Sequence, residues 1–337
     1  MASRPTIIDV ARVAGVSKTT VSRVVNEDTR KVSDETVERV MQAITSLGYE
    51  HNSVARSLRT DRTNIVMLMI PDITNPFWPE VARGIQDAMD KAGYSVVFAN
   101  IDWNKAREQE FLRIAMRTRV DGILINPIHV SEEQILATRI PSVILGTRPG
   151  FKALDMVGSD TSLAMHKALE YLVRMGHQQI GLLLGSSETG SNLSRKNSFY
   201  EFFAERDLPV NPEHVVEVTF DNHGGERGMR RLLELAQIPT AVIASNDLIA
   251  LGALQVANEM GYQVPKDISI MGIDDIYASS LSIPALTTMR KQKYEIGQKA
   301  AELLLTRMGL ADDVLLAPRA IRFPCHLVVR SSTGAAI

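Results

Sequence analysis

The chain has 337 residues, of which 45% are hydrophobic and 23% charged, and its formal net charge is −2 at pH 7. These values are typical of a soluble globular protein with two or three domains, and they exclude a strongly basic surface as the source of any affinity for nucleic acid. The single cysteine, Cys325, excludes an internal disulfide framework and favours a reducing, cytoplasmic location. We expect no export signal and no membrane segment, because the N-terminus leads straight into a capped helix and no apolar run reaches about 18 residues.

Two short amphipathic segments joined by a glycine turn open the chain over Thr6–Asn26. Thr6 with Asp9 is a helix capping pattern, and Gly15 can adopt the left-handed conformation that ends a first helix. Ser17 is placed to cap a second helix that runs to about Val25. A third helix follows, capped by Ser33 and ended by Gly48. This arrangement predicts a helix-turn-helix unit.

The polar face of the second helix carries the residues that we expect to read DNA. Lys18 and Thr19 lie in its first turn, which enters the major groove in such units, and Arg23 can reach further along the groove. Arg and Lys pair best with guanine, while Ser and Thr bind phosphates or base edges. Periodicity alone leaves open a generic three-helix unit that binds protein or nothing. The predicted DNA-binding residues of this region are Thr6, Ser17, Lys18, Thr19, Thr20, Ser22, Arg23, Asn26 and Ser33.

The residue identities decide between these alternatives. The segment DVARVAGVSKTTVSRVVN, residues 9–26, closely resembles the DNA-reading head of the lactose-repressor (LacI/GalR) family of bacterial transcription regulators. The resemblance continues over residues 48–58, which in that family form a hinge helix that folds only on operator DNA and wedges a leucine into the minor groove. Asn52, Ala55 and Leu58 match this hinge and are predicted to contact DNA. His51 stands where the family usually has proline, and we interpret it as a tolerated linker residue.

Beyond residue 62 the sequence alternates buried-strand runs with amphipathic helices. The strand Ile65–Ile70 begins one series, and a helix from about Thr161 to Met175, followed by the strand Ile180–Leu184, begins a second. Each series predicts a parallel sheet covered by helices on both faces. A helix over Tyr294–Met308 and a last strand over Ile321–Val329 are expected to cross back between the two sets. The predicted fold class is a small all-α helix-turn-helix domain plus an α/β, periplasmic-binding-protein-like core of two doubly wound parallel-sheet subdomains.

The family resemblance covers essentially the whole chain. In the core its marks are residues 71–78, 176–177, 245–253, 272–275 and 284–288. Members of the family close two subdomains around a small effector, often a sugar. We therefore expect a DNA-binding head (1–50), a hinge helix or linker (51–62), an N-terminal effector-core subdomain (63–160 and 290–319) and a C-terminal one (161–289 and 320–331).

The resemblance also implies an effector pocket at the carboxyl ends of the strands. Relatives stack a ring on aromatic residues there and bind sugar oxygens with arginine and polar side chains. Alternatively, Phe77, Trp78 and Phe220 could be ordinary core residues, and Arg195 could pair with a local acid. The effector-binding residues implied by the resemblance are Asn75, Phe77, Trp78, Arg148, Arg195, Phe220, Asn246 and Asp274.

Two departures from the family change the charge of this pocket. Thr147 stands where relatives often have aspartate, and Lys291 where they often have glutamine, so the pocket gains about two positive charges. A desolvated Lys291 beside two arginines is costly unless an anion neutralises it. We therefore add Lys291 to the effector-binding set and hypothesise a sugar acid or a phosphorylated sugar as effector. The alternative is that Lys291 points to solvent.

The sequence thus predicts a repressor of a carbohydrate-catabolic operon that binds palindromic operator DNA as a homodimer. A periplasmic sugar-binding protein would share the core fold but would lack the DNA-binding head. No nucleophile elbow, phosphate-binding loop, dinucleotide fingerprint or zinc-ligand spacing is present, so we expect neither enzymatic activity nor a metal or other cofactor.

Overall fold

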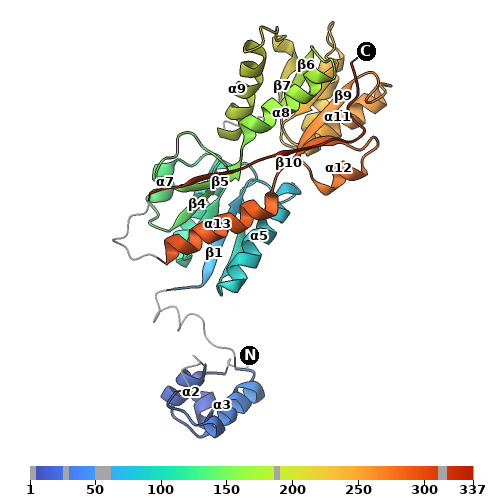
Figure 1. The fold of residues 1–337 in the computed structure, drawn as a ribbon. Helices are drawn as coiled ribbons and strands as arrows, with labels where there is room; N and C mark the ends of the chain where they lie inside the picture. Colours follow the sequence, from blue (N-terminus) through green and yellow to red (C-terminus); the bar gives the residue numbers. More distant parts are fainter. Residues whose placement is uncertain (1–4, 26–29, 50–61, 186–189, 310–316, 337) are drawn as a thin grey trace. The chain divides into compact units, whose positions relative to one another are not determined.

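The computed structural model describes residues 5–25, 30–49, 62–185, 190–309 and 317–336. The chain divides into two compact units, Met1–Thr63 and Asn64–Ile337 (Figure 1). The first unit is a small helical head and the second is an α/β core with two sheets. The predicted fold class is therefore confirmed.

Local signals build the head as expected. Thr6 and Asp9 form a capping box, in which the Thr6 N–H donates to the Asp9 carboxylate at 2.9 Å, and Gly15 ends the first helix with a φ of 64°. Val10 and Val21 are fully buried in the small core that the helices share. The helices of the described head are α1 (Ile7–Ala14), α2 (Lys18–Val25) and α3 (Asp34–Leu47).

The first sheet of the core has six parallel strands in the order β11-β5-β4-β3-β1-β2. One face packs on α5 and α13 and the other on α6 and α7, because the strand residues are apolar on both sides. The strands are β1 (Ile65–Ile70), β2 (Ser95–Asn100), β3 (Gly122–Ile125), β4 (Ser142–Leu145), β5 (Asp155–Ser159) and β11 (Ala320–Phe323). The helices are α5 (Phe77–Lys91), α6 (Lys105–Thr118), α7 (Glu132–Leu136) and α13 (Lys293–Met308).

The second sheet repeats this plan in the order β12-β10-β9-β8-β6-β7, with β12 antiparallel to β10. Helices α8 and α9 cover one face, and α10 and α11 cover the other. The strands are β6 (Ile180–Gly185), β7 (Val215–Val218), β8 (Ala241–Ala244), β9 (Ser269–Asp274), β10 (Thr287–Arg290) and β12 (His326–Val328). The helices are α8 (Thr161–Arg174), α9 (Gly190–Ala204), α10 (Asn222–Leu233), α11 (Asp247–Glu259) and α12 (Tyr277–Leu281), with a 3₁₀ turn at Pro212–His214.

The last predicted strand, Ile321–Val329, is in fact two strands in two sheets. β11 joins the first sheet and β12 the second, so residues 320–323 lie with the N-terminal subdomain rather than the C-terminal one as predicted. Pro324, which has no N–H to donate, separates them. Figure 1 shows this C-terminal segment running across both halves of the core. The chain also crosses between the two subdomains at residue 160 and at residues 291–292.

Candidate functional site

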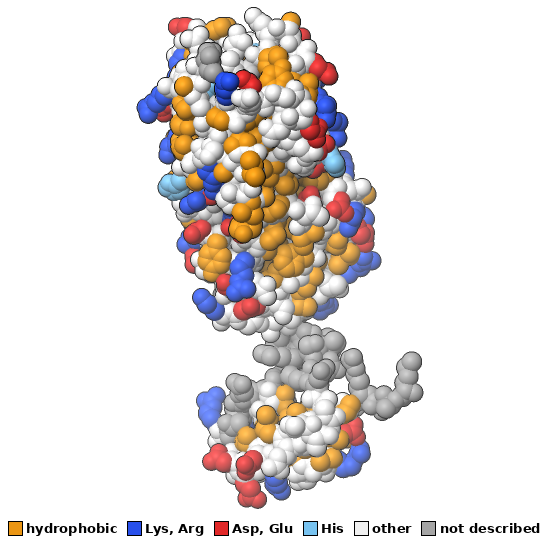
Figure 2. All heavy atoms as spheres, turned by 90° about the vertical axis from the view of Figure 1, so that its right-hand side faces the viewer, with side chains coloured by type: hydrophobic (Ala, Val, Ile, Leu, Met, Phe, Trp, Pro, Cys, Tyr) orange, Lys and Arg blue, Asp and Glu red, His pale blue; other side chains and the backbone are white. Residues whose placement is uncertain are grey.

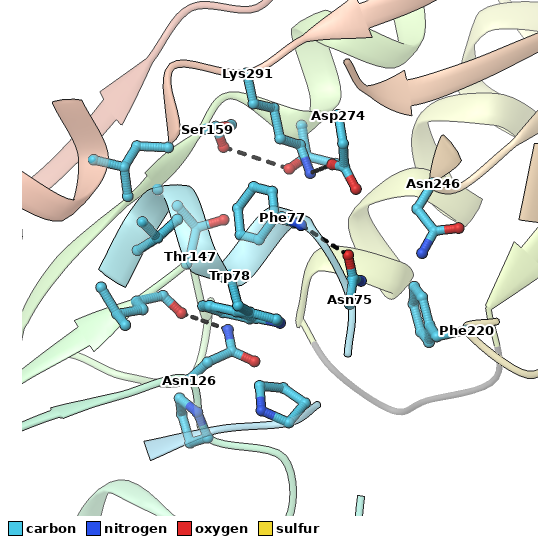
Figure 3. A pocket seen from close by; sticks show the side chains of 18 of the residues that line it. Asn75, Phe77, Trp78, Asn126, Thr147, Ser159, Phe220, Asn246, Asp274 and Lys291 are labelled. Carbon is cyan, nitrogen blue, oxygen red and sulfur yellow. Dashed lines mark hydrogen bonds and ion pairs between the residues drawn. The ribbon is translucent and has the colours of Figure 1, made fainter. Parts of the chain in front are cut away.

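A cavity of about 120 Å³ lies where the carboxyl ends of the strands of both sheets meet (Figure 3). All nine residues predicted to bind an effector line it. Its lining is Pro71, Asn75, Phe77, Trp78, Val81, Trp103, Asn126, Pro127, Leu145, Gly146, Thr147, Arg148, Gly158, Ser159, Thr161, Arg195, Phe220, Asn246, Asp274, Lys291 and Ile296. The topology thus brings together side chains from both subdomains.

The loop after β1 supplies an amide and two rings. The Asn75 side chain accepts a hydrogen bond from the Phe77 N–H at 3.0 Å, which fixes the start of α5. The rings of Phe77 and Trp78 meet edge to face, with centroids 5.0 Å apart. Trp78 also belongs to the core cluster under this sheet, so it is both a core residue and a wall of the cavity.

Arg148, after β4, is held by backbone carbonyls. Its guanidinium donates to the carbonyl oxygens of Pro127 and Ile128. Burial lowers the pKa of Arg148, and the nearby carboxylate of Glu108 opposes that shift. Glu108 is itself fully buried and accepts backbone N–H bonds from residues 128, 129 and 130 at 2.7, 2.7 and 3.1 Å. The loop that binds Arg148 is therefore anchored by one buried carboxylate.

Arg195, on α9, is only 5% exposed. Its Nη1 donates to Asn192 Oδ1 at 2.9 Å, and its Nε is buried without a hydrogen-bond partner. Burial lowers the pKa of Arg195, and the charge of Asp274 opposes this. In the part of the chain that the structure describes, no carboxylate lies within ion-pair distance of Arg195, so the alternative of a local acid partner is not supported.

Lys291 points into the cavity and not to solvent. Its Nζ lies 2.8 Å from a carboxylate oxygen of Asp274, and the side chains are 9% and 6% exposed (Figure 3). The ammonium also lies 5.1 Å from the centre of the Phe77 ring, within range of a cation–π interaction. The desolvation cost predicted for an unpaired Lys291 is therefore offset within the protein, because Asp274 is its counter-ion.

A network of buried polar side chains surrounds the backbone and carboxylate of Asp274. Asp274 and Asp275 both have positive φ values, 129° and 56°, and Lys293 Nζ donates to their carbonyl oxygens at 2.9 and 2.7 Å. Asp247 accepts three hydrogen bonds from the neighbouring segments, and burial together with the charge of Asp274 raises its pKa to about 6. Asn246 caps α11 through its side-chain oxygen, while its amide nitrogen faces the cavity in Figure 3.

Four polar or aromatic lining residues were missed by the sequence reasoning: Trp103, Asn126, Ser159 and Thr161. All of them lie at or just after the carboxyl ends of β2, β3 and β5, so strand position alone was the available signal. Trp103 is the most notable, because its ring stacks on that of Phe220 with centroids 4.9 Å apart and an interplanar angle of 5°.

The head presents its predicted reading face to solvent. Lys18, Thr19 and Arg23 are exposed on α2, while Thr20 and Ser22 are half-buried. Ser17 lies at the N-terminus of α2 and accepts a hydrogen bond from the Thr20 N–H at 3.1 Å, and the exposed Thr6 and Ser33 cap α1 and α3. The remaining predicted DNA contacts lie outside the described residues: Asn26, Asn52, Ala55 and Leu58.

Among the residues that the structure describes, no helix is both long and apolar enough to cross a membrane. No group of three or more His, Cys, Asp or Glu side chains among them is arranged to hold a metal ion.

A helix-turn-helix head joined to two α/β subdomains that enclose a charged cavity defines a class: DNA-binding transcription regulators with a periplasmic-binding-protein-like core. Residues 6–52 match the model for bacterial regulatory proteins of the lacI family, and residues 169–333 match that for a periplasmic binding protein-like domain. The chain is 35% identical over 308 residues to the HTH-type transcriptional repressor PurR of Pasteurella multocida (strain Pm70), covering 90% of this chain and 92% of that relative. The chain therefore belongs to the LacI family of DNA-binding transcriptional repressors.

Solved structures agree with this assignment. The lac repressor dimer bound to operator and the anti-inducer ONPF aligns with a TM-score of 0.87 at 27% identity, over 99% of this chain and 100% of that one. The transcriptional regulator CelR in complex with cellobiose aligns with a TM-score of 0.74 at 28% identity, over 98% and 100%. A LacI family regulator from Enterococcus faecium with bound ribose aligns with a TM-score of 0.71 at 28% identity, over 80% and 99%. The relatives found by sequence are transcriptional repressors, which is consistent with a regulatory function.

Proposed function

We propose that this protein is a cytoplasmic homodimeric repressor of a carbohydrate-catabolic operon, and that a small, negatively charged sugar derivative in the cavity controls its affinity for operator DNA. The observation that carries the effector proposal is Arg195, a buried guanidinium that faces the cavity with an unpartnered Nε. A buried cation with an unused donor is costly, and an anionic oxygen from a ligand removes that cost.

The charges around the cavity favour an anion. Among the residues that the structure describes, Arg148, Arg195 and Lys291 line it together with one carboxylate, that of Asp274. Because Asp274 is already paired with Lys291, the positive charge without a described carboxylate partner lies on the arginines. We therefore propose that the anionic group of the effector binds Arg195 rather than Lys291. A carboxylate or phosphate can bind there while the ion pair of Lys291 with Asp274 stays intact.

Size and polarity favour a single sugar unit. A cavity of about 120 Å³ holds roughly 8 to 12 water-sized groups, which matches a small ligand better than a drug-sized one. The amides of Asn75, Asn126 and Asn246 line its walls and can bind hydroxyl groups, and the rings of Trp78 and Phe220 can cover a sugar face. The relatives solved with cellobiose and with ribose add support for a carbohydrate.

Isothermal titration of matched sugars tests this proposal. D-gluconate and D-galacturonate are compared with D-glucose and D-galactose, and we expect at least one acid to bind about tenfold more tightly than its neutral partner. Arg195→Gln should remove this preference. Lys196→Gln is the matched control, because Lys196 follows on α9 but pairs with Glu217 at the surface. Tight binding of a neutral sugar that neither Arg195→Gln nor Lys291→Gln alters would overturn the anionic effector.

For operator recognition, we propose that Lys18, Thr19 and Arg23 read bases. Selection of binding sites from random duplex DNA should yield a palindrome with the full-length protein. Arg23→Ala should then weaken binding by about 1–3 kcal/mol and relax the sequence preference at one position in each half-site. Arg12→Ala is the control, because Arg12 is exposed on α1 and pairs with Asp9. Equal loss on cognate and random DNA would contradict base reading by Arg23.

For the homodimer, an apolar patch on the core is the supporting observation. Tyr277, Leu281 and Ile283 are 78%, 62% and 87% exposed on and after α12. Figure 2 views the molecule from the side on which α12 lies in Figure 1 and shows hydrophobic side chains gathered in a band across this face. Exposed apolar patches of this kind mark protein interfaces. Sedimentation should find a dimer for the wild type and a monomer for Ile283→Asp; an unchanged dimer would place the interface elsewhere.

A further inference from the structure

Two aromatic rings from different subdomains stack on each other in the lining of the cavity. Trp103 follows β2 in the first sheet and Phe220 follows β7 in the second, 117 positions later. Their ring centroids are 4.9 Å apart and their planes are within 5° of parallel. Both rings line the effector cavity and both side chains are half-buried. The contact therefore joins the two subdomains at the cavity itself.

The two rings occupy corresponding positions in the two halves. β2 and β7 are the edge strands beside β1 and β6, and each leads through a short loop into the next helix, α6 or α10. Each loop is fixed to its own sheet and helix, so the rings move with their subdomains. The stack can exist only when the subdomains are close together.

Both loops are built to hold these rings in place. Asp102 and Trp103 adopt positive φ values of 49° and 56°, and the Trp103 carbonyl oxygen lies 3.0 Å from His129 Nε2. Phe220 lies directly over Gly185: a Cβ on that glycine would be only 2.4 Å from the ring. Left-handed backbone conformations and an interior glycine reduce the stability of the fold, and a loop that did not position a ring would not require them.

We infer that Trp103 and Phe220 form an aromatic gate, which holds the two subdomains together at the cavity and must unstack before an effector can enter or leave. The role of the effector in this inference rests on the proposed function of the cavity, whereas the contact between the subdomains does not. Phe220, expected to stack on the effector, is already covered by Trp103. Trp103 is thereby a positioning residue for the site, on the opposite subdomain from the ring that it covers.

The size of the effect follows from the contact. Aromatic pairs contribute an amount that corresponds to about a 2- to 13-fold change in an equilibrium constant, beyond the burial of their area. Removing either ring should therefore raise the population of open molecules by about that factor. Removing both should do no more than removing one, because a single contact is lost.

Cys325 provides a reporter of opening that needs no effector. It is the only cysteine in the chain, is 1% exposed and lies in the crossover between β11 and β12. In full-length protein, we expect its rate of reaction with Ellman's reagent to rise about 2- to 13-fold in Trp103→Ala and in Phe220→Ala, with no further rise in the double variant. Trp103→Phe, which can still stack, should stay within about twofold of the wild type.

A second measurement checks the stack itself. The wild-type emission minus that of Trp103→Phe isolates the fluorescence of Trp103 from that of Trp78, the other tryptophan. Acrylamide should quench this signal about twice as efficiently in Phe220→Ala, where one face of the indole is uncovered. Unchanged Cys325 reactivity in both alanine variants, or additive effects in the double variant, would overturn the gate. Since neither assay uses a ligand, failure of the sugar titrations would leave this result standing.

Discussion

The carboxyl group of Asp247 should make the stability of the core depend on pH in an unusual direction. Asp247 is fully buried, and its pKa of about 6 is raised first by burial and then by the charge of Asp274. In the unfolded chain its pKa returns to the ordinary value of 3.8. The folded state therefore holds this proton more tightly than the unfolded state does, which stabilises the fold most below pH 3.8, and the benefit is lost as the pH rises through 6.

The magnitude follows from the two pKa values. A pKa of about 6 against 3.8 corresponds to about 3 kcal/mol in total, of which about 1 kcal/mol is lost between pH 5 and pH 7. Asp247→Asn should imitate the protonated acid. Its oxygen can still accept from the Ile276 N–H and the Ser279 hydroxyl, and its amide can donate to the Thr288 hydroxyl, which now donates to Asp247 at 2.5 Å.

The assay is urea unfolding of the core of the full-length protein at pH 5, 6 and 7. The free energy of unfolding of Asp247→Asn relative to wild type should rise by about 1 kcal/mol from pH 5 to pH 7. Asp275→Asn is a control of opposite sign: burial raises the pKa of Asp275, but hydrogen bonds from Arg290 and Arg330 outweigh this and lower it overall, so its stabilising effect is lost as the pH falls. Parallel pH profiles for wild type and Asp247→Asn would refute the reasoning.

Three further substitutions test other parts of the site. Glu108→Gln should destabilise the core by about 2–3 kcal/mol in urea unfolding, because an amide nitrogen would face backbone N–H donors that now bind a carboxylate; a loss below half of this would contradict the anchoring role. Arg195→Met should stabilise the ligand-free protein by about 1–2 kcal/mol while abolishing the binding of sugar acids, and a destabilised variant would show that the guanidinium is better satisfied than its contacts indicate. Gly185→Ala should displace the Phe220 ring and raise the Cys325 labelling rate as Phe220→Ala does; a wild-type rate would mean that the ring tolerates the added methyl group.

Local signals in the sequence were sufficient for the head and for most strands and helices. A capping box such as Thr6 with Asp9 involves residues three positions apart, and Gly15 ends α1 through its own backbone conformation. The cavity residues were found because parallel strands present their carboxyl ends at one edge, and because family resemblance identified Arg195 and Asp274 among them. Short segments without a strong period, such as α7 and α12, were not predicted.

Contacts between distant segments were beyond the sequence. Lys291 was correctly expected in the pocket, but its partner is set by the pairing of β9 with β10, which places Arg290 opposite Asp274 and so brings the next residue within ion-pair distance. From the sequence, an anionic effector was expected to neutralise Lys291, but in the fold Asp274 already does so. Likewise, apolar alternation over Ile321–Val329 is the same whichever sheet the residues join, so only the tertiary structure divides them into two strands.

By itself, the sequence determined the fold class and the helix-turn-helix, because periodicity, caps and strand ends are encoded within a few residues. The family resemblance added nine of the side chains around the cavity. The tertiary structure decided which charges are paired and which rings meet. The Lys291–Asp274 ion pair and the stack of Trp103 on Phe220 depend on strand order and on the closure of two subdomains. Electrostatic and aromatic contacts act over a few ångströms in space, and no pattern along the chain specifies that distance.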